Sequence, residues 1–450
     1  MKRIIDYFLA EWKKDELRKP LLLRGARQVG KTYAVRALAK KFDSFVEINL
    51  EQDEVARKII ERDMDVHRIL LQLSTHRSVK IIPGKTLLFF DEIQQVPQAI
   101  SCLRYFYEQI PDLHVIAAGS LLEFAIQQVG IPVGRVSSLY LYPVSFLEFL
   151  AAQKKYLWIK TLLSQTTNEP LFEELHTTLM NELALFIVVG GMPEAINAWF
   201  KTTSLQTVST IHHSLLDAYQ QDFGKYAKKH QIKYLEILFQ HAIGQIGNKF
   251  MFSRVGEYKK RELAPALDLL EKAGLIHKIF KTAAQGLPLG AQADLDDFKI
   301  AFLDTGLCLA TLGLDIASWI IDPSIAFINN GAVVESFVGQ ELLAYAPPSR
   351  KKPLFYWRKD QKGSDAEVDY VIQLNQSLVP VEVKSGTSKR IKSSYLFLES
   401  HPEAQYAIRF SARNYEHAKE IFSFPLYAIA NPLAHADAQL SDAIKALMIE

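Results

Sequence analysis

The chain has 450 residues, of which 49% are hydrophobic and 23% charged, the mixture of an ordinary globular protein with roughly two to four domains. Its formal net charge of +2 disfavours a globally basic nucleic-acid binder but is compatible with a local basic groove. The two cysteines, Cys102 and Cys308, lie far apart, which excludes a disulfide framework and a CxxC metal pattern and favours a reducing, cytoplasmic location.

The N-terminal segment predicts an amphipathic helix. Ile4, Ile5, Phe8, Leu9 and Trp12 recur at helical spacing between charged residues, which is not the pattern of a signal peptide. No apolar run approaches the length of a membrane span, so we expect no membrane partner.

Four short apolar runs come next, separated by helical patterns, at residues 20–23, 45–48, 86–90 and 113–118. Because these runs are apolar on both faces, they predict an α/β fold with a parallel sheet that helices cover on two sides.

The rest of the chain changes character twice. Residues 144–225 predict helices with a break at residues 190–193, and residues 226–325 predict helices followed by short strands. From residue 326 onwards the pattern is a helix and then strands, including 368–374 and 378–383, which we interpret as a separate α/β domain.

A phosphate-binding loop (P-loop) follows the first predicted strand and precedes a predicted helix. It matches the pattern G-x-x-x-x-G-K-[ST] with Gly25, Ala26, Arg27, Gln28, Val29, Gly30, Lys31 and Thr32. In this context the backbone N–H groups point at phosphate oxygens, and the helix N-terminus adds a favourable dipole. We therefore expect ATP as the ligand, with Lys31 on its β and γ phosphates and the Thr32 hydroxyl on Mg²⁺.

Two carboxylates end the buried strand of residues 86–90. Burying Asp91 and Glu92 at a strand tip is costly unless a cation lies beside them, and Mg²⁺ supplies that charge. Asp91 is expected to hold the metal through water, and Glu92 to polarise the attacking water. An Asp-Glu cap at a helix start is the alternative.

Ser120 and Arg135 complete the expected nucleotide site. Ser120 follows the next strand and is a candidate to touch the γ-phosphate or the water, with a helix N-cap as the equal alternative. Arg135 is a candidate to stabilise transition-state charge, in cis or across a subunit interface, with a solvated arginine as the alternative.

Several stretches resemble the AAA-type ATPases of bacteria and archaea. They are RGARQVGKT at 24–32, FDEIQ at 90–94, GS at 119–120, GR at 134–135, LYPVSFLEF at 141–149, GGMPEA at 190–195, LDTGL at 303–307 and NGAVVE at 330–335. The resemblance implies an AAA core at 1–143, a helical extension at 144–225, a winged-helix-like segment at 226–325 and a restriction-endonuclease-like domain at 326–450. It leaves open whether the protein forms a homo-oligomer.

The middle of the chain has the pattern of a winged helix. A helix over 261–273 ends in Ala-Gly before strand signals, and Lys259, Lys260 and Arg261 at its start are candidates for phosphate contacts with DNA. The alternative is a module that only packs beside the nucleotide.

The C-terminal strands carry a second set of charged residues. A tight turn at Asn375-Gln376 sets Asp369 opposite Glu382, and the period of a strand puts Lys384 on the face of Glu382. Facing carboxylates repel, and a divalent metal relieves the repulsion. Glu335, on the preceding helix, is a candidate for a further carboxylate ligand, and Lys384 for positioning the attacking water.

This set resembles the PD-(D/E)xK nuclease superfamily, although Glu367-Val368 replaces the usual proline before Asp369. The resemblance implies a second Mg²⁺ or Mn²⁺ held by Glu335, Asp369 and Glu382. A phosphate-backbone groove is expected along the basic and aromatic residues Arg350, Lys351, Lys352, Tyr356, Trp357, Arg358, Lys359 and Lys362. The alternative is a salt-bridged hairpin in which Lys384 neutralises the acids without a metal.

Two functions remain open. The first is an ATP-driven enzyme whose C-terminal domain binds, and in one version cuts, nucleic acid. The second is an ATP-gated signalling or assembly switch whose C-terminal domain is a non-catalytic interaction module. A small-molecule kinase is disfavoured, because Glu92 after Asp91 suits hydrolysis and no acceptor pocket can be recognised.

Overall fold

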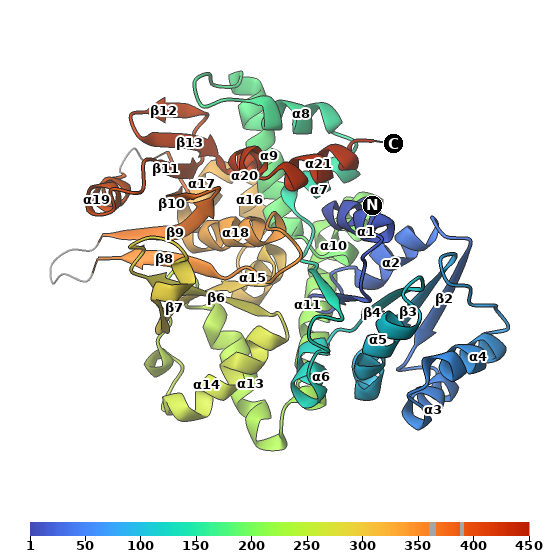
Figure 1. The fold of residues 1–450 in the computed structure, drawn as a ribbon. Coiled ribbons are helices and arrows are strands. Elements are labelled where there is room, and N and C mark those ends of the chain that lie inside the picture. The colour runs from blue at the N-terminus through green and yellow to red at the C-terminus, as the bar shows by residue number, and fades with distance from the viewer. Residues whose placement is uncertain (360–365, 388–390, 450) are drawn as a thin grey trace. The chain divides into compact units, whose positions relative to one another are not determined.

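The computed structural model describes residues 1–359, 366–387 and 391–449 (Figure 1). The chain forms two compact units, and each is described by itself. The N-terminal unit comprises Met1–Tyr142 with the short segments Lys272–Gly274 and Pro347–Lys351, and the C-terminal unit comprises the rest.

The N-terminal unit is built on a five-stranded parallel sheet in the order β2-β3-β4-β1-β5. Its strands are β1 (Leu21–Arg24), β2 (Ser44–Asn49), β3 (Thr86–Asp91), β4 (His114–Ala118) and β5 (Ser137–Tyr140). The expected parallel sheet is therefore confirmed. The edge strand β5 was not predicted, because the sequence Ser-Ser-Leu-Tyr has no apolar run.

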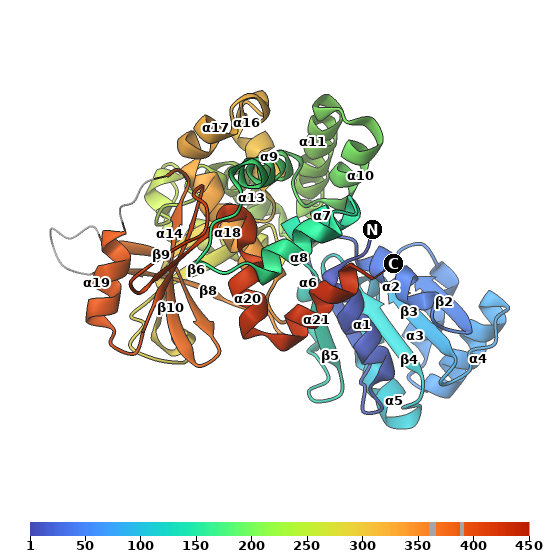
Figure 2. The same ribbon diagram turned by 90° about the horizontal axis from the view of Figure 1, so that it is seen from above.

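Helices cover both faces of this sheet (Figure 2). They are α1 (Ile4–Lys14), α2 (Lys31–Ala39), α3 (Glu54–Arg62), α4 (Val66–Arg77), α5 (Pro97–Gln109) and α6 (Leu122–Val129), with a 3-10 turn, η1 (Ile93–Gln95). Helices α3 to α6 share one apolar core with alternate residues of the strands, such as Leu88 and Phe90. Helix α2 packs against β3 and β4 and also contacts α1, as expected for a strand that is apolar on both sides.

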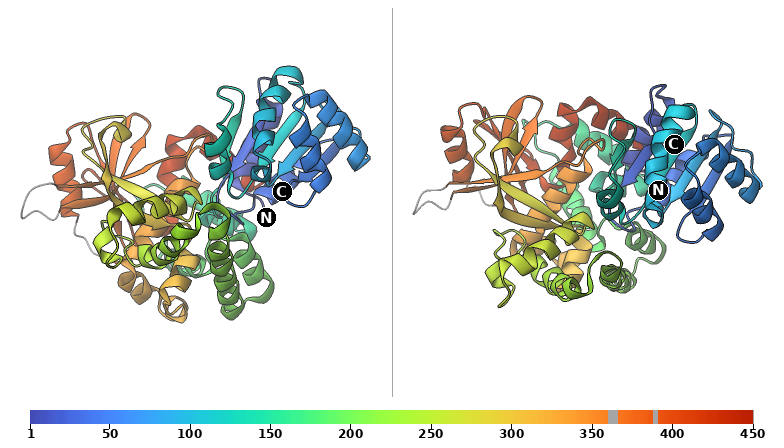
Figure 3. Two further views of the ribbon diagram at one scale, coloured as in Figure 1. Left: turned by 90° about the horizontal axis from the view of Figure 1, so that it is seen from below. Right: turned by 60° about the horizontal axis from the view of Figure 1, so that its bottom comes forward.

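The C-terminal unit is built around an eight-stranded mixed sheet in the order β12-β13-β11-β10-β9-β8-β6-β7. Its strands are coloured from yellow to red in Figure 3. The strands are β6 (Ile276–Thr282), β7 (Ala293–Phe302), β8 (Leu354–Arg358), β9 (Glu367–Leu374), β10 (Ser377–Lys384), β11 (Ala407–Ser411), β12 (Glu416–Ala418) and β13 (Ile421–Pro425).

The helices between residues 143 and 272 come before this sheet in the sequence. They are α7 (Phe146–Ala152), α8 (Tyr156–Ser164), α9 (Glu173–Val189), α10 (Pro193–Thr202), α11 (Leu205–Gln221), α12 (Phe223–Tyr226), α13 (Lys229–Ile243), η2 (Phe252–Arg254) and α14 (Lys260–Lys272). The helical character expected for residues 144–225 is therefore observed.

The remaining helices lie between or after the strands. They are η3 (Leu289–Gln292), α15 (Thr305–Leu312), α16 (Ala317–Ile321), α17 (Pro323–Asn329), α18 (Gly331–Ala344), α19 (Lys392–Ser400), η4 (Leu426–Ala428), α20 (Ala430–Ala436) and α21 (Ala438–Leu447). Helix α18, which carries Glu335, packs against β7 and β10.

The sheet of the C-terminal unit crosses the expected boundary between residues 325 and 326. Strand β6 pairs in parallel with β8, and the antiparallel partner of β6 is β7. The hairpin of the winged-helix-like segment therefore continues the sheet of the C-terminal strands. Local patterns predicted the strands, but the pairing joins segments that are far apart in the sequence.

Within the described part of the chain, no single helix is both long enough and apolar enough to cross a membrane. One bent pair, α9 with α10, meets the length and composition criteria together, with an angle of 119° between its two helices.

Candidate functional site

The P-loop connects β1 to α2 and has the backbone that the motif requires. Gly25, Gln28 and Gly30 have positive φ values of 142°, 64° and 102°, and α2 begins directly at Lys31. A Cβ added at Gly25 would overlap the carbonyl oxygen of Leu141, so this position accepts only glycine. The loop therefore forms a concave run of backbone N–H groups at a helix N-terminus, which suits an anionic ligand.

Lys31 is buried inside this loop. Its ammonium donates to the carbonyl oxygens of Gly25 at 2.9 Å and Ala26 at 2.7 Å. Burial lowers the pKa of Lys31 to about 8, although the charges of Glu92 and Asp91 oppose the shift. An anion bound in the loop would stabilise the charged form of Lys31 and relieve the cost of its burial.

Thr32 and Asp91 lie side by side, as the motif predicts for a magnesium site. The Thr32 hydroxyl donates to Asp91 Oδ2 at 2.9 Å, and the Glu92 N–H donates to Asp91 Oδ1 at 3.1 Å. Burial raises the pKa of Asp91, and the bond from Thr32 opposes this. A hydroxyl and a carboxylate together at the base of the loop fit the oxygen preference of Mg²⁺.

Glu92 has a left-handed backbone conformation, with φ 51°. Its carboxylate accepts hydrogen bonds from the Ser120 hydroxyl at 3.2 Å and from the side-chain amide of Gln94. The structure thus brings Glu92 and Ser120 together, as expected of residues that follow neighbouring parallel strands. Gln94 was not predicted as a site residue, although it lies within the FDEIQ stretch. It orients Glu92.

Arg135 lies apart from this group. Its guanidinium pairs with Glu108 of α5 at 2.9 Å and lies 6.0 Å from the ring centre of Tyr107, and 44% of its side chain is exposed. In this structure Arg135 therefore has the surface environment of the solvated alternative. Its proposed role in catalysis depends on a rearrangement or on a second subunit.

Arg3 is a further residue at the P-loop that the sequence did not indicate. Its buried guanidinium donates to the carbonyl oxygens of Val29 at 3.1 Å and Tyr142 at 2.9 Å. These contacts join residues separated by 26 and 139 positions. No local pattern predicts them.

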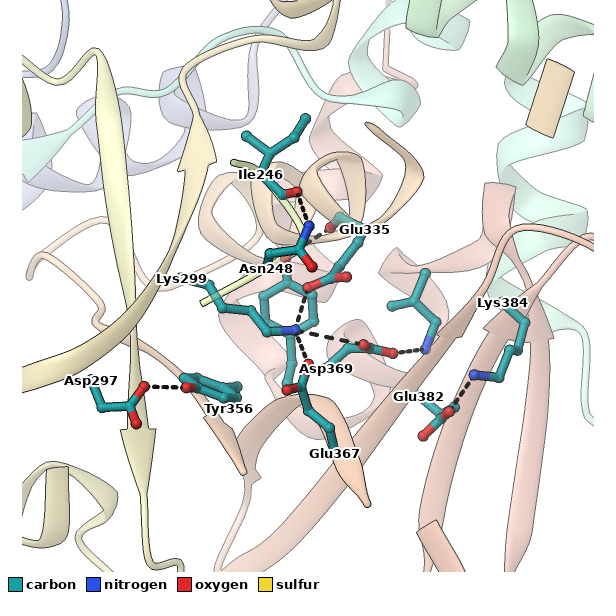
Figure 4. Close-up of polar contacts among 12 residues, drawn as sticks. Ile246, Asn248, Asp297, Lys299, Glu335, Tyr356, Glu367, Asp369, Glu382 and Lys384 are labelled. Carbon is teal, nitrogen blue, oxygen red and sulfur yellow. Dashed lines mark hydrogen bonds and ion pairs between the residues drawn. The ribbon is translucent and has the colours of Figure 1, made fainter. Parts of the chain in front are cut away.

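The second charged set lies in the C-terminal unit, where it centres on Lys299, which the sequence did not single out (Figure 4). The ammonium of Lys299 lies 2.9 Å from Glu335 Oε1 and 3.9 Å from Asp369 Oδ1, and it also pairs with Glu367. Burial raises the pKa of Glu335 to about 8, although Lys299 opposes the shift. Burial also raises the pKa of Asp369.

Glu382 and Lys384 form a separate ion pair at the end of β10 (Figure 4). The hairpin register runs from Ser377 opposite Leu374 to Val381 opposite Tyr370, so its next step sets Glu382 opposite Asp369, as predicted. The Asp369 carboxylate, however, accepts from the Val383 N–H at 2.7 Å. The side chain of Lys384 is 31% exposed. Burial lowers its pKa, but the carboxylates of Glu382, Asp369 and Glu335 together outweigh burial, so that the pKa is raised.

Among the described residues, no three histidine, cysteine, aspartate or glutamate side chains converge in a way that would hold a metal ion. Glu335, Asp369 and Glu382 were expected to do so. The structure places a lysine ammonium beside Glu335 and Asp369, and another beside Glu382.

The two aromatic residues of the groove expected for a phosphate backbone are not available to line it. Tyr356 and Trp357 are buried in β8, where the Tyr356 hydroxyl donates to Asp297 and Trp357 packs edge-on against Phe397. The basic residue Lys362 lies outside the described residues. At the start of α14, Lys260 pairs with Asp296 at 2.7 Å and stays exposed.

Three family models match consecutive parts of the chain. Residues 17–150 match an AAA domain, residues 180–318 match a domain of unknown function (DUF8612), and residues 330–429 match another (DUF4143). No curated protein matches the chain.

Three solved structures are similar to the chain at low sequence identity. A Walker-type ATPase of Pyrococcus abyssi is 14% identical with a TM-score of 0.45, over 68% of this chain and 95% of that one. PCH-2 of C. elegans is 12% identical with a TM-score of 0.27, over 45% and 62%. The Drosophila ORC bound to AT-rich DNA and Cdc6 gives 9% identity and a TM-score of 0.20, over 69% and 91%.

The P-loop, the buried lysine and the acidic end of β3 lie inside the segment that matches the AAA model. The chain therefore carries an AAA-type ATPase domain, followed by two domains that are similar to families of unknown function.

Proposed function

We propose that the N-terminal unit binds ATP with Mg²⁺ and hydrolyses it, and that the nucleotide state controls the binding of nucleic acid by the C-terminal unit. The observation that carries the ATPase part is the contact of Thr32 with Asp91 beside a P-loop that encloses Lys31. The P-loop and the end of β3 thus supply a metal ligand pair and a phosphate-binding cation side by side.

Lys31, Thr32 and Asp91 would hold the substrate. Lys31 exchanges its bonds to the Gly25 and Ala26 carbonyls for phosphate oxygens, since these carbonyls are weaker acceptors than an anion. Thr32 and Asp91 would hold Mg²⁺, which neutralises charge on the phosphates when bound.

Glu92 would polarise the attacking water. Gln94 and Ser120 support this role because both donate to its carboxylate and so fix its position. Arg135 would act as the charge-stabilising arginine after leaving Glu108, in cis or from a second subunit.

The C-terminal part of the proposal rests on Glu382 and Lys384. Lys384 is partly exposed beside a carboxylate at a strand end, so it can meet a phosphate group of nucleic acid. In the nuclease version, Glu335, Asp369 and Glu382 would hold Mg²⁺ or Mn²⁺, and Lys384 would position the attacking water.

A second candidate, the non-catalytic interaction module, is favoured by Lys299. The ammonium of this lysine already lies beside Glu335 and Asp369, two of the expected metal ligands. An ATP-gated switch would need only the shape and charge of the C-terminal unit and no metal-dependent cleavage by it.

One experiment separates these possibilities. Purified protein is incubated with plasmid DNA, ATP and either Mg²⁺ or Mn²⁺, and phosphate release, DNA retention and DNA cutting are recorded. Lys31→Ala and Lys384→Ala are compared with Lys58→Ala, a control at an exposed helix-surface ion pair.

We expect Lys31→Ala to abolish phosphate release while Lys58→Ala leaves it unchanged. Cutting that vanishes in Lys384→Ala would establish the nuclease version. DNA retention without cutting that changes in Lys31→Ala would leave a binding module controlled by ATP. An ATPase that neither retains DNA or RNA nor responds to them would refute the nucleic-acid part and favour the signalling switch.

A further inference from the structure

Three carboxylates from two elements meet at one ammonium in the C-terminal unit (Figure 4). Glu335 comes from α18, and Glu367 and Asp369 come from β9. Lys299, on β7, pairs with Glu335 at 2.9 Å and with Glu367, and it lies 3.9 Å from Asp369. The positive charge therefore comes from a strand that carries none of the three acids.

The ammonium of Lys299 is closed off from solvent. Only 1% of its side chain is exposed, and it lies 5.2 Å from the ring centre of Tyr356. The turn at Gly247 lies close to α18, because a Cβ added there would lie 3.0 Å from the Ala332 Cβ and 3.4 Å from Glu335 Oε2. The side chain of Lys299 is therefore enclosed by its acidic partners and by Tyr356.

The balance of charge explains why the lysine is needed. Neighbouring buried carboxylates repel one another and lose their hydration, so a cation has to lie among them. A buried lysine is equally unfavourable without acidic partners. One ammonium against three carboxylates leaves excess negative charge, which either a proton on a carboxyl group or a divalent cation in place of the ammonium would relieve.

We propose that Lys299 is the resident cation of this centre, a side chain that holds Glu335, Glu367 and Asp369 together in place of a divalent metal ion. The C-terminal unit then assembles this centre without metal. The inference is independent of ATP hydrolysis and of nucleic-acid binding, but it excludes the nuclease version, in which Glu335 and Asp369 hold a metal ion. It assigns to Lys299 a role distinct from that of Lys384, which pairs with Glu382.

The test measures Mn²⁺ binding by the nucleotide-free full chain, with electron paramagnetic resonance as the readout. Every protein carries Asp91→Asn, so that the nucleotide site contributes nothing. Lys299→Met is compared with Lys278→Met. Lys278 is a matched control because it also pairs with two acids, Asp268 at 2.6 Å and Glu271 at 3.1 Å.

We expect no bound Mn²⁺ at this centre in the parent protein or in Lys278→Met. Lys299→Met should gain a bound Mn²⁺ that raises its unfolding temperature, and adding Asp369→Asn should remove both effects. A merely structural lysine would give loss of stability without this gain of metal.

Two results would overturn the proposal. One is Mn²⁺ bound by the parent protein and lost in Asp369→Asn, and the other is a folded Lys299→Met that binds none. Should Lys299→Met not fold without metal, the same variant with added Mn²⁺ decides. The proposal expects Mn²⁺ to replace the lost positive charge and restore a cooperative unfolding transition, and a protein that stays unfolded contradicts it.

Discussion

At the scale of single residues, the buried lysine of the P-loop links nucleotide binding to protons. Burial lowers the pKa of Lys31 to about 8, so its ammonium loses its proton as the pH rises through that value in the nucleotide-free protein. A bound polyanion favours the charged form. ATP binding should therefore take up a proton between about pH 8 and 9, where ATP itself has finished titrating, and affinity should fall as the pH rises.

Calorimetry in buffers of different ionisation enthalpy measures this uptake. Lys31→Arg is the control, because its guanidinium stays charged over the whole range and cannot take up a proton. A binding enthalpy of the unmodified protein that is the same in all buffers would contradict the linkage.

Glu92→Gln tests the second role at this scale. The amide keeps the shape of the side chain and an acceptor oxygen for Ser120, but it cannot polarise water. We expect phosphate release to fall by about 10²–10⁴-fold while ATP binding is retained. Turnover measurements check the loss of phosphate release, and equilibrium binding of a fluorescent ATP analogue checks the retention of ATP binding. An equal loss of turnover and of binding would assign Glu92 to ATP binding.

At the scale of elements, the backbone conformation of the P-loop limits which residue type can occupy position 25. A Cβ there would overlap the Leu141 carbonyl, and φ is 142°. Gly25→Ala should therefore abolish nucleotide binding and lower the unfolding temperature. Gly84→Ala is the matched control, since Gly84 also has a positive φ, 77°, but open space around it.

The control change should cost only about 1–2 kcal/mol of unfolding free energy and leave ATP binding unchanged. Equal behaviour of the two variants would show that the contact with Leu141 does not determine the loop conformation.

The start of α7 depends on a buried acid of α18. The Phe146 N–H donates to both carboxylate oxygens of Glu341, at 3.1 and 3.3 Å, and burial raises the pKa of Glu341 to about 8. Because the folded-state pKa lies above the ordinary value, the contribution of Glu341 to stability is complete at acid pH. It is lost as the pH rises through about 8.

Glu341→Gln removes this titration and keeps an acceptor for the Phe146 N–H. The variant should lose less stability than the unmodified protein between about pH 5 and 9, by a difference on the order of a few kcal/mol. Denaturant unfolding at each pH measures it, with the exposed Glu236→Gln as the control. Parallel pH profiles of Glu341→Gln and the unmodified protein would rule out the role of this carboxyl.

At the scale of the whole molecule, the two compact units give nucleotide binding a specific thermal signature. A ligand stabilises the unit that binds it, by about 2.7 kcal/mol at a hundredfold excess over Kd. Differential scanning calorimetry should therefore show ATP and Mg²⁺ raising the unfolding transition of the N-terminal unit, with no shift in Lys31→Ala. A shift of equal size in that variant would place the binding elsewhere.

Much of the N-terminal unit could be predicted from the sequence, because its information is local. The P-loop is one continuous stretch, and the apolar runs that become β1 to β4 predict both the strands and the polar residues at their ends. Parallel strands then bring Asp91, Glu92 and Ser120 to the same edge. The hairpin of Asp369 and Glu382 could be predicted for the same reason, since a short turn sets its register.

Only the tertiary structure revealed the residues that complete these sites. Arg3 reaches Val29, β6 pairs with β8, and Lys299 lies between Glu335 and Asp369, all across long stretches of chain. None of these partners differs in type or spacing from ordinary surface or strand residues. Which charges share a buried space depends on how distant elements pack. That packing placed Lys299, from β7, beside Glu335 and Asp369, two of the acids for which the sequence indicated a metal.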